Sequence, residues 1–268
     1  MKYSEKKLNE LRTNLEKVDQ EFKSNRETDR DAIAPALKYK DRNDREMAGL
    51  ICAVLAYGKV DQIIRSANSI LLKMGESPTQ WLRNASQKEI QAITAGWKHR
   101  FNDSKDLYTL LTVLRQIYLD SDIESKLKIK NSDSIRGVLT SLSKLFREFN
   151  VKQVVPKAYR KNSFHYLFPY PEDGSACKRL NLYLRWVAGV SPFDLSIWTS
   201  LDRSKLIIPL DVHLMRISKQ LGFTKRNTAD WKTAEEVTEF LKKLDPNDPT
   251  RFDFALCHLG ISGQSFKF

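Results

Sequence analysis

The sequence predicts an all-α fold, and three observations support this prediction. Apolar residues recur at intervals of three and four along most of the 268-residue chain, which is the period of an amphipathic helix. Gly75 and Gly222 each follow such a series, at the position where a helix commonly ends. The one β-like run, LIIPL, contains Pro209, and proline removes a strand hydrogen bond.

Composition indicates a basic globular protein. Lysine and arginine number 45 against 33 acidic residues, which gives a net charge of +12, and 41% of residues are hydrophobic. An excess of basic residues favours polyanionic partners, although net charge alone does not show that the partner is nucleic acid. No run reaches the roughly eighteen apolar residues that cross a bilayer, and the N-terminus has no signal-peptide core. We therefore expect no membrane association and a cytoplasmic location, at the nucleoid if the protein is bacterial.

Cysteine and histidine are sparse and scattered. Cys52, Cys177 and Cys257 include no pair at CxxC spacing, and three thiolates are too few for a four-cysteine cluster. The sequence predicts no metal site and no cofactor.

The helical segments can be placed in order. An opening helix carries Leu8 to Phe22, and the polar stretch that follows it reads as an extended connection over a surface. Asp44 is expected to cap a helix that ends near Gly58. Further apolar series predict helices over 63–74, 107–117, 135–149 (capped by Ser134), about 176–187, 214–221, 231–244 (capped by Asp230) and from near Pro249 onward. Residues 151–176 break the helical pattern.

Lys178 is the first candidate for chemistry. Two prolines, Pro169 and Pro171, and then Gly174 precede it, so a tight turn leads straight into a helix whose first turn contains Lys178. Free backbone N–H groups at such a start can hold a phosphate, and the helix dipole disfavours an ammonium there. A neutral lysine can attack a sugar carbon and form a Schiff base. A surface lysine is the plainer interpretation of this residue alone.

Asp211 is the second candidate. The apolar run before it delivers the carboxylate to the N-terminus of an amphipathic helix, where an ordinary N-cap explains it fully. If a cleft faces that end, the same carboxylate can stabilise a developing cationic sugar or take a proton. His213 could donate to a phosphate, or it could lie on the helix surface.

These residues resemble a known family. The segment IPLDVHLMRISKQLG is similar to the motif of the helix–hairpin–helix DNA glycosylase superfamily, and the prolines, Gly174 and Lys178 resemble its hairpin and Schiff-base lysine. Lys178 and Asp211 are 33 positions apart, and this spacing resembles that of the archaeal 8-oxoguanine DNA glycosylase branch. From about Tyr39 onward the chain also resembles a bacterial family of uncharacterised proteins near that branch. The hairpin PEDGS departs from the superfamily pattern, and the iron–sulfur cysteine loop of some members is absent from the sequence.

The resemblance implies a two-lobed fold with a DNA cleft between the lobes. Residues 44–150 would form a helical barrel lobe, and 1–43 with 151–268 a helix–hairpin–helix lobe. The alternative is that the two lobes act as one compact domain. Lys178 and Asp211 would be catalytic. Gly174, Ser175, Ala176 and His213 would bind the DNA backbone.

The base pocket is the part the sequence determines least. By resemblance, Asp253 would lie near the pocket, with Phe254 or Cys257 near the base, although an ordinary place in the core is the stronger interpretation of Phe254 taken alone. Tyr57 could intercalate in the duplex or simply pack. Trp186, Trp198 and Trp231 are equivalent candidates for stacking a flipped purine, and Arg100 could contact phosphate.

The resulting prediction is a monomeric, bifunctional DNA glycosylase and AP lyase. It would act on double-stranded DNA that contains a damaged base, an oxidised purine such as 8-oxoguanine, through a lysine Schiff base. One alternative is a monofunctional glycosylase in which Asp211 activates water. Another is a non-catalytic DNA-binding protein of the same fold.

Overall fold

The computed structural model describes residues 3–24, 31–130, 132–149 and 161–262. Within these ranges the helices and one small hairpin make up the regular secondary structure, and the all-α class that the sequence predicts is confirmed. The elements in order are α1 (Glu5–Ser24), α2 (Ala34–Leu37), α3 (Arg42–Val54), α4 (Val60–Met74), α5 (Pro78–Asn84), α6 (Gln87–Thr94), β1 (Lys98–His99), β2 (Asn102–Asp103), α7 (Ser104–Asp120), α8 (Ile123–Leu127), α9 (Ile135–Arg147), α10 (Lys161–Leu167), η3 (Pro171–Asp173), α11 (Lys178–Ala188), η4 (Arg203–Lys205), α12 (Val212–Gln220), α13 (Trp231–Leu241) and α14 (Asp253–Ser262).

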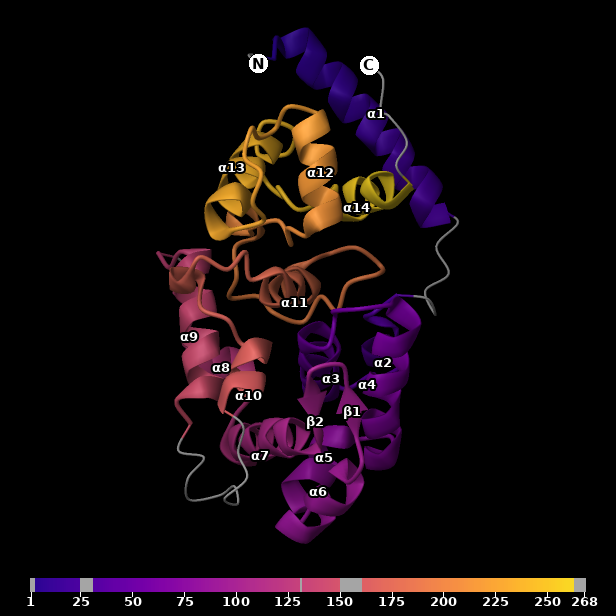
Figure 1. The fold of residues 1–268 in the computed structure, drawn as a ribbon, viewed down its shortest axis with the longest axis vertical. Coiled ribbons are helices and arrows are strands. Elements are labelled where there is room, and N and C mark those ends of the chain that lie inside the picture. The colour runs from indigo at the N-terminus through magenta and orange to yellow at the C-terminus, as the bar shows by residue number, and fades with distance from the viewer. Residues whose placement is uncertain (1–2, 25–30, 131, 150–160, 263–268) are drawn as a thin grey trace.

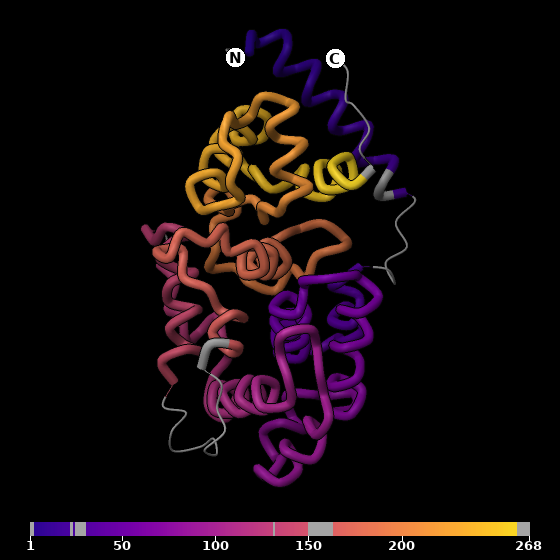
Figure 2. The backbone as a smooth tube through the Cα atoms, viewed as in Figure 1, coloured from indigo at the N-terminus to yellow at the C-terminus, as the bar shows by residue number. Residues whose placement is uncertain are grey.

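The helices gather at two ends of the molecule with α11 between them. Figure 1 shows α1 and α12–α14 at one end and α2–α10 at the other. The backbone trace in Figure 2 shows the chain entering and leaving α11 in the middle. Because α11 packs on α3, and its first residue is paired with Asp211 at the start of α12, it links the two ends.

The contacts between helices do not locate the boundary between the two expected lobes. Helix α1 packs on α14, next to the C-terminal helices with which residues 1–43 were expected to associate. Helix α2, from the same segment, packs instead on α3 and α4, and α10 packs on α7. The division at 43/44 and 150/151 stays a prediction.

Several predicted caps are confirmed because they depend only on neighbouring residues. Ser134 Oγ accepts from Gly137 N, Asp211 Oδ1 accepts from the first turn of α12, and Asp230 Oδ1 accepts from Thr233 N. Gly75 and Gly222 adopt positive φ after α4 and α12. Each cap satisfies N–H or C=O groups that a helix end leaves without an intrahelical partner.

The predicted cap at Asp44 is wrong. Asp41 is the N-cap of α3, and its side chain accepts from Asn43 N and Asp44 N. Asp44 lies buried in the first turn of the helix, where Oδ1 accepts from Thr79 N at 2.7 Å and Oδ2 from Ser77 Oγ at 3.0 Å. A distant segment, the start of α5, uses the carboxylate that the local pattern assigns to capping. Helix α3 ends at Val54, four residues before Gly58.

Other local predictions also need correction. The connection after α1 is not wholly extended, because Ile33, Ala34 and Ala36 are buried around the short helix α2. The break in pattern over 151–176 contains α10, while residues 150–160 lie outside the described ranges. The last helix starts at Asp253, not near Pro249. The hairpin of β1 and β2 pairs Lys98 with Asp103 and His99 with Asn102, which is too short to produce a strand periodicity.

A buried carboxylate stabilises α3, the helix on which α11 packs. Glu46 on α3 is fully buried and accepts from Tyr118 Oη at 2.6 Å, Ile123 N at 2.9 Å and Trp198 Nε1 at 2.6 Å. These donors satisfy a group that would otherwise be costly to bury. Glu46 therefore joins α3, α7, the start of α8 and the Trp198 loop.

Candidate active site

One cavity collects most of the predicted site residues. It has a volume of about 720 Å³, and its walls come from five separate segments of the chain. Its lining residues are Asp31, Ala32, Ala56, Tyr57, Gly58, Val60, Ile63, Lys178, Leu182, Arg185, Trp186, Pro209, Asp211, His213, Asp253, Phe254, Cys257, His258 and Ile261. A cavity of this size is in the range that holds a nucleoside-sized ligand.

Lys178 and Asp211 meet in this cavity. Lys178 Nζ lies 3.2 Å from Asp211 Oδ2, and the side chains are 37% and 18% exposed. The two oxygens of Asp211 have different partners, since Oδ1 accepts from His213 N and Leu214 N, both at 2.9 Å. The residue is therefore both a helix cap and the partner of the lysine.

A buried apolar segment positions Asp211. Leu206 to Leu210 are each no more than 9% exposed, and Ile208 N donates to Thr238 Oγ1 of α13 at 3.0 Å. The LIIPL run is thus a buried connection and not a strand. Because it is anchored in the core up to Leu210, the next residue emerges at the cavity wall at a fixed point.

The hairpin before α11 positions Lys178. Pro171–Asp173 form η3, Gly174 continues it with φ 80°, and Cys177 precedes the helix with φ 49°. Asn181 Nδ2 donates to Ala176 O at 3.0 Å, and Trp231 N donates to Gly174 O at 3.1 Å. These bonds tie the turn to α11 and α13, so Lys178 begins its helix from a braced loop.

The predicted backbone-binding residues divide between two places. His213 lines the cavity, whereas Gly174, Ser175 and Ala176 lie outside its lining. Gly174 N already donates to Pro171 O and Cys177 N to Ser175 Oγ. Those two N–H groups are occupied within the hairpin, and phosphate binding by Gly174, Ser175 and Ala176 stays a prediction.

The predicted base-pocket residues all line the cavity. Asp253, Phe254 and Cys257 come from α14, and Tyr57 comes from the loop after α3. Of the three tryptophans, Trp186 lines the cavity, whereas Trp198 is buried against Glu46 and Trp231 lies outside the lining. Burial raises the pKa of the Cys257 thiol to about 12, with Asp211 and Asp253 adding to the effect, so this thiol is protonated at neutral pH.

Tyr57 is held in place on its hydroxyl side. Its single hydroxyl proton can be donated to His99 O, 3.1 Å from Oη, or to Asn102 Oδ1. Its ring packs edge-on against His99, with centroids 4.6 Å apart. These contacts describe a wall residue braced by the β1–β2 hairpin, and an intercalating role for Tyr57 stays a prediction.

Arg185 is a site residue that the sequence analysis missed. Its guanidinium lies 3.5 Å from Asp253 Oδ2 and 3.6 Å from Asp194 Oδ1, and its side chain is 11% exposed. Arg185 follows Lys178 by seven positions, which is two helical turns, so both lie on one face of α11. That spacing is the signal from which it could have been found.

Asp253 is the buried carboxylate of the cavity. Burial raises its pKa from the ordinary 3.8 to about 6, and the nearby charge of Asp211 adds to this, while Arg185 and Lys178 act in the opposite direction. In Arg185 burial lowers the pKa, but the carboxylates of Asp194 and Asp253 outweigh it. The network keeps a carboxylate beside the Lys178–Asp211 pair that takes up a proton near pH 6.

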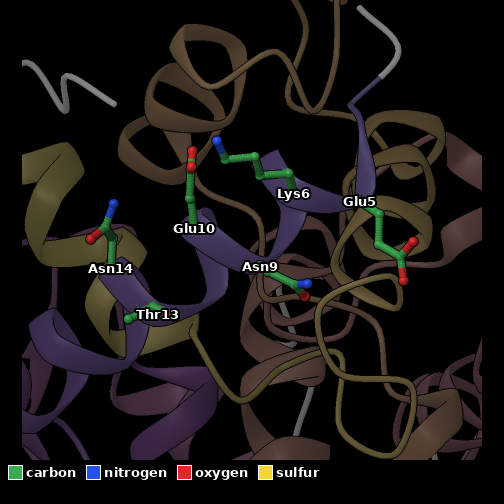
Figure 3. Close-up of a pocket in the computed structure, with 6 residues that line it drawn as sticks. All are labelled: Glu5, Lys6, Asn9, Glu10, Thr13 and Asn14. Atoms are coloured by element: carbon green, nitrogen blue, oxygen red, sulfur yellow. The ribbon is translucent and has the colours of Figure 1, made fainter.

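A second hollow has no comparable chemistry. It has a volume of about 660 Å³ and is lined by Glu5, Lys6, Asn9, Glu10, Thr13 and Asn14. Figure 3 shows these residues along α1. All six residues belong to one helix, and their side chains fan outward from it.

Among the residues that the structure describes, no cluster of histidine, cysteine, aspartate or glutamate could hold a metal ion. None of the described helices is long and apolar enough to span a bilayer.

Comparison with known proteins places the chain in a family. Residues 31–262 match the family described as "Protein of unknown function (DUF2400)". The chain belongs to this family. The matched range contains every residue that lines the cavity, from Asp31 to Ile261, whereas α1 precedes it. No curated protein and no solved structure matches the chain.

Proposed function

We propose that the protein is a bifunctional DNA glycosylase and AP lyase that removes an oxidised purine such as 8-oxoguanine. The observation that carries this proposal is the 3.2 Å approach of Lys178 Nζ to Asp211 Oδ2 at the wall of the 720 Å³ cavity. A primary amine beside a carboxylate is the pairing that amine nucleophiles use. Both sequence motifs resemble the helix–hairpin–helix superfamily, and this resemblance is the reason that we propose DNA as the substrate.

The proposed reaction begins with proton transfer. Lys178 must lose a proton to become nucleophilic, and Asp211 Oδ2 is positioned to accept it. The lysine nitrogen then forms a bond to C1′ as the glycosidic bond breaks, and the bonding electrons leave with the base, which takes up a proton. Opening of the sugar ring gives the Schiff base. Loss of a C2′ proton expels the 3′ phosphate, and water finally releases the lysine.

The charges in the cavity suit this chemistry. Lys178 and Arg185 face three carboxylates, those of Asp31, Asp211 and Asp253. An interior with an excess of carboxylates stabilises a sugar that becomes cationic in the transition state. It does not favour a phosphate, so apart from the predicted contact with His213 the DNA backbone would bind outside the cavity, where the net charge of +12 attracts it.

Borohydride reduction tests the proposal. The protein is incubated with a duplex containing 8-oxoguanine, and both base release and a reduced covalent adduct are measured. Lys178→Gln should lose both, while Lys232→Gln, which changes an exposed lysine on α13, should keep both. Base release without an adduct would favour the monofunctional alternative. Binding without release over a panel of lesions would favour the non-catalytic alternative.

A further inference from the structure

The turn of the β1–β2 hairpin presents an aromatic ring to solvent. Phe101 is 62% exposed, and Arg100 before it adopts a left-handed conformation with φ 50°. Non-glycine residues in this region are uncommon and indicate a constrained turn. The turn therefore holds a large apolar side chain outward.

Phe101 does not stand alone, because it belongs to an ordered group of rings. Its ring is parallel to that of Tyr57, with an interplanar angle of 2° and centroids 6.2 Å apart. It meets Tyr166 of α10 edge-on at 5.8 Å, and Tyr57 meets Tyr166 edge-on at 5.3 Å. Since the Tyr57 hydroxyl is anchored to the hairpin, the three rings form a braced platform.

A buried cation lies beneath this platform. The Arg179 guanidinium carbon is 4.2 Å from the Tyr166 ring centroid and 4.9 Å from that of Tyr57. It donates to Val54 O at 3.0 Å and to Tyr166 O. Burial lowers its pKa, and within the described part of the chain no carboxylate is paired with it. Its positive charge is therefore not neutralised locally.

The platform adjoins the cavity. Tyr57 and Gly58 line the cavity, and a Cβ on Gly58 would come within 2.9 Å of Arg100 Cδ. The hairpin turn is thus packed against the cavity wall, and Arg179 directly follows Lys178 in the chain. The lining of this cavity, which does not include Phe101, contains two exposed apolar residues, Val60 and Ile261.

We propose that Phe101, with Tyr166 and Arg100 beside it, stacks an unpaired nucleobase that remains outside the cavity. Flat rings with cations close by are the surface on which single-stranded bases stack. Arg100, whose guanidinium lies 5.4 Å from the Phe101 ring centroid, and the buried Arg179 favour a negatively charged strand. The inference rests on the proposed function only in taking DNA as the ligand.

Fluorescence of 2-aminopurine tests this proposal without requiring chemistry. The full chain is titrated with a duplex in which 2-aminopurine faces a stable abasic analogue, and with the same duplex fully paired. The wild type should bind the first duplex more tightly and quench its fluorescence. Phe101→Ala should weaken that binding about tenfold, in line with the cost of removing one stacking ring. Phe101→Trp should restore both affinity and quenching.

Leu72→Ala is the matched control, because Leu72 on α4 is 69% exposed and outside the ring group. Equal affinities of the Phe101→Ala and Leu72→Ala proteins would overturn the proposal, as would equal wild-type binding of the two duplexes. A dimer in sedimentation that Phe101→Ala disperses, with DNA binding unchanged, would assign the platform to a second copy instead. Absence of a borohydride adduct would count against the Schiff-base mechanism of Lys178 alone and would leave this binding result standing.

Discussion

Lys178 Nζ lies 3.2 Å from Asp211 Oδ2, while Asp211 Oδ1 caps helix α12. One carboxylate thus has a structural oxygen and an oxygen directed at the proposed nucleophile. The cap holds the side chain in the orientation that the pair needs. Two substitutions of Asp211 can separate these roles.

Asp211→Asn should keep the cap and lose the chemistry. Asparagine caps helices as well as aspartate does, so the free energy of unfolding should change by less than about 1 kcal/mol. The neutral amide cannot accept the lysine proton, and base release should fall roughly a hundredfold or more. Asp211→Ala should show the same loss of base release and also lose about 1 kcal/mol of stability. Equal activity of the Asn variant and the wild type in single-turnover assays would rule out the proposed proton transfer.

Gly260→Ala should loosen the contact between α12 and α14. A Cβ at this position would lie 2.5 Å from His213 O and 2.8 Å from His213 C, so the helices must separate. We expect a loss of roughly 1–3 kcal/mol in urea unfolding and slower base release, because His213 and Asp211 share the displaced helix end. Gly137→Ala is the control, since its Cβ meets only Ser134 Oγ at 3.4 Å, and alanine in a helix should stabilise by up to about 1 kcal/mol. A Gly260→Ala protein as stable as the wild type would contradict the close contact.

Asp253→Asn should change how stability depends on pH. The pKa of Asp253 is raised by burial to about 6 from 3.8, so between these values the folded protein holds a proton that the unfolded chain releases. Wild-type stability therefore decreases as the pH rises through this window. The variant lacks this contribution, and its stability relative to wild type should rise by roughly 2–3 kcal/mol from pH 4 to pH 7. Urea unfolding across the window measures this, and parallel curves for the two proteins would contradict it.

The sequence predicted those parts of the fold that depend on neighbouring residues. Apolar spacing identified the long helices, and Ser134, Asp211 and Asp230 were recognised as caps because a cap is completed within one turn. Asp41 and Asp44 show the limit of this reasoning. Both are aspartates at the start of α3, and only the distant contact of Asp44 with Thr79 distinguishes them.

The candidate site could be predicted only in part for the same reason. Lys178 and Asp211 each begin a helix, but their approach depends on how α11 and α12 are placed by the rest of the chain. Arg185 acquires its partners from Asp194 and from Asp253, 68 positions later. In the ring group, Phe101 of the β1–β2 hairpin, whose strands have two residues each, contacts Tyr166 of α10. These contacts join residues that are far apart in the chain, so no local periodicity predicts them.

The most direct test of the central claim is the position of the covalent bond. The reduced adduct with 8-oxoguanine duplex is digested, and mass spectrometry locates the sugar-modified peptide. We predict the modification on Lys178, with less than about a hundredth as much adduct in Lys178→Gln. A sugar attached to any other residue, or an undiminished adduct in Lys178→Gln, would contradict it.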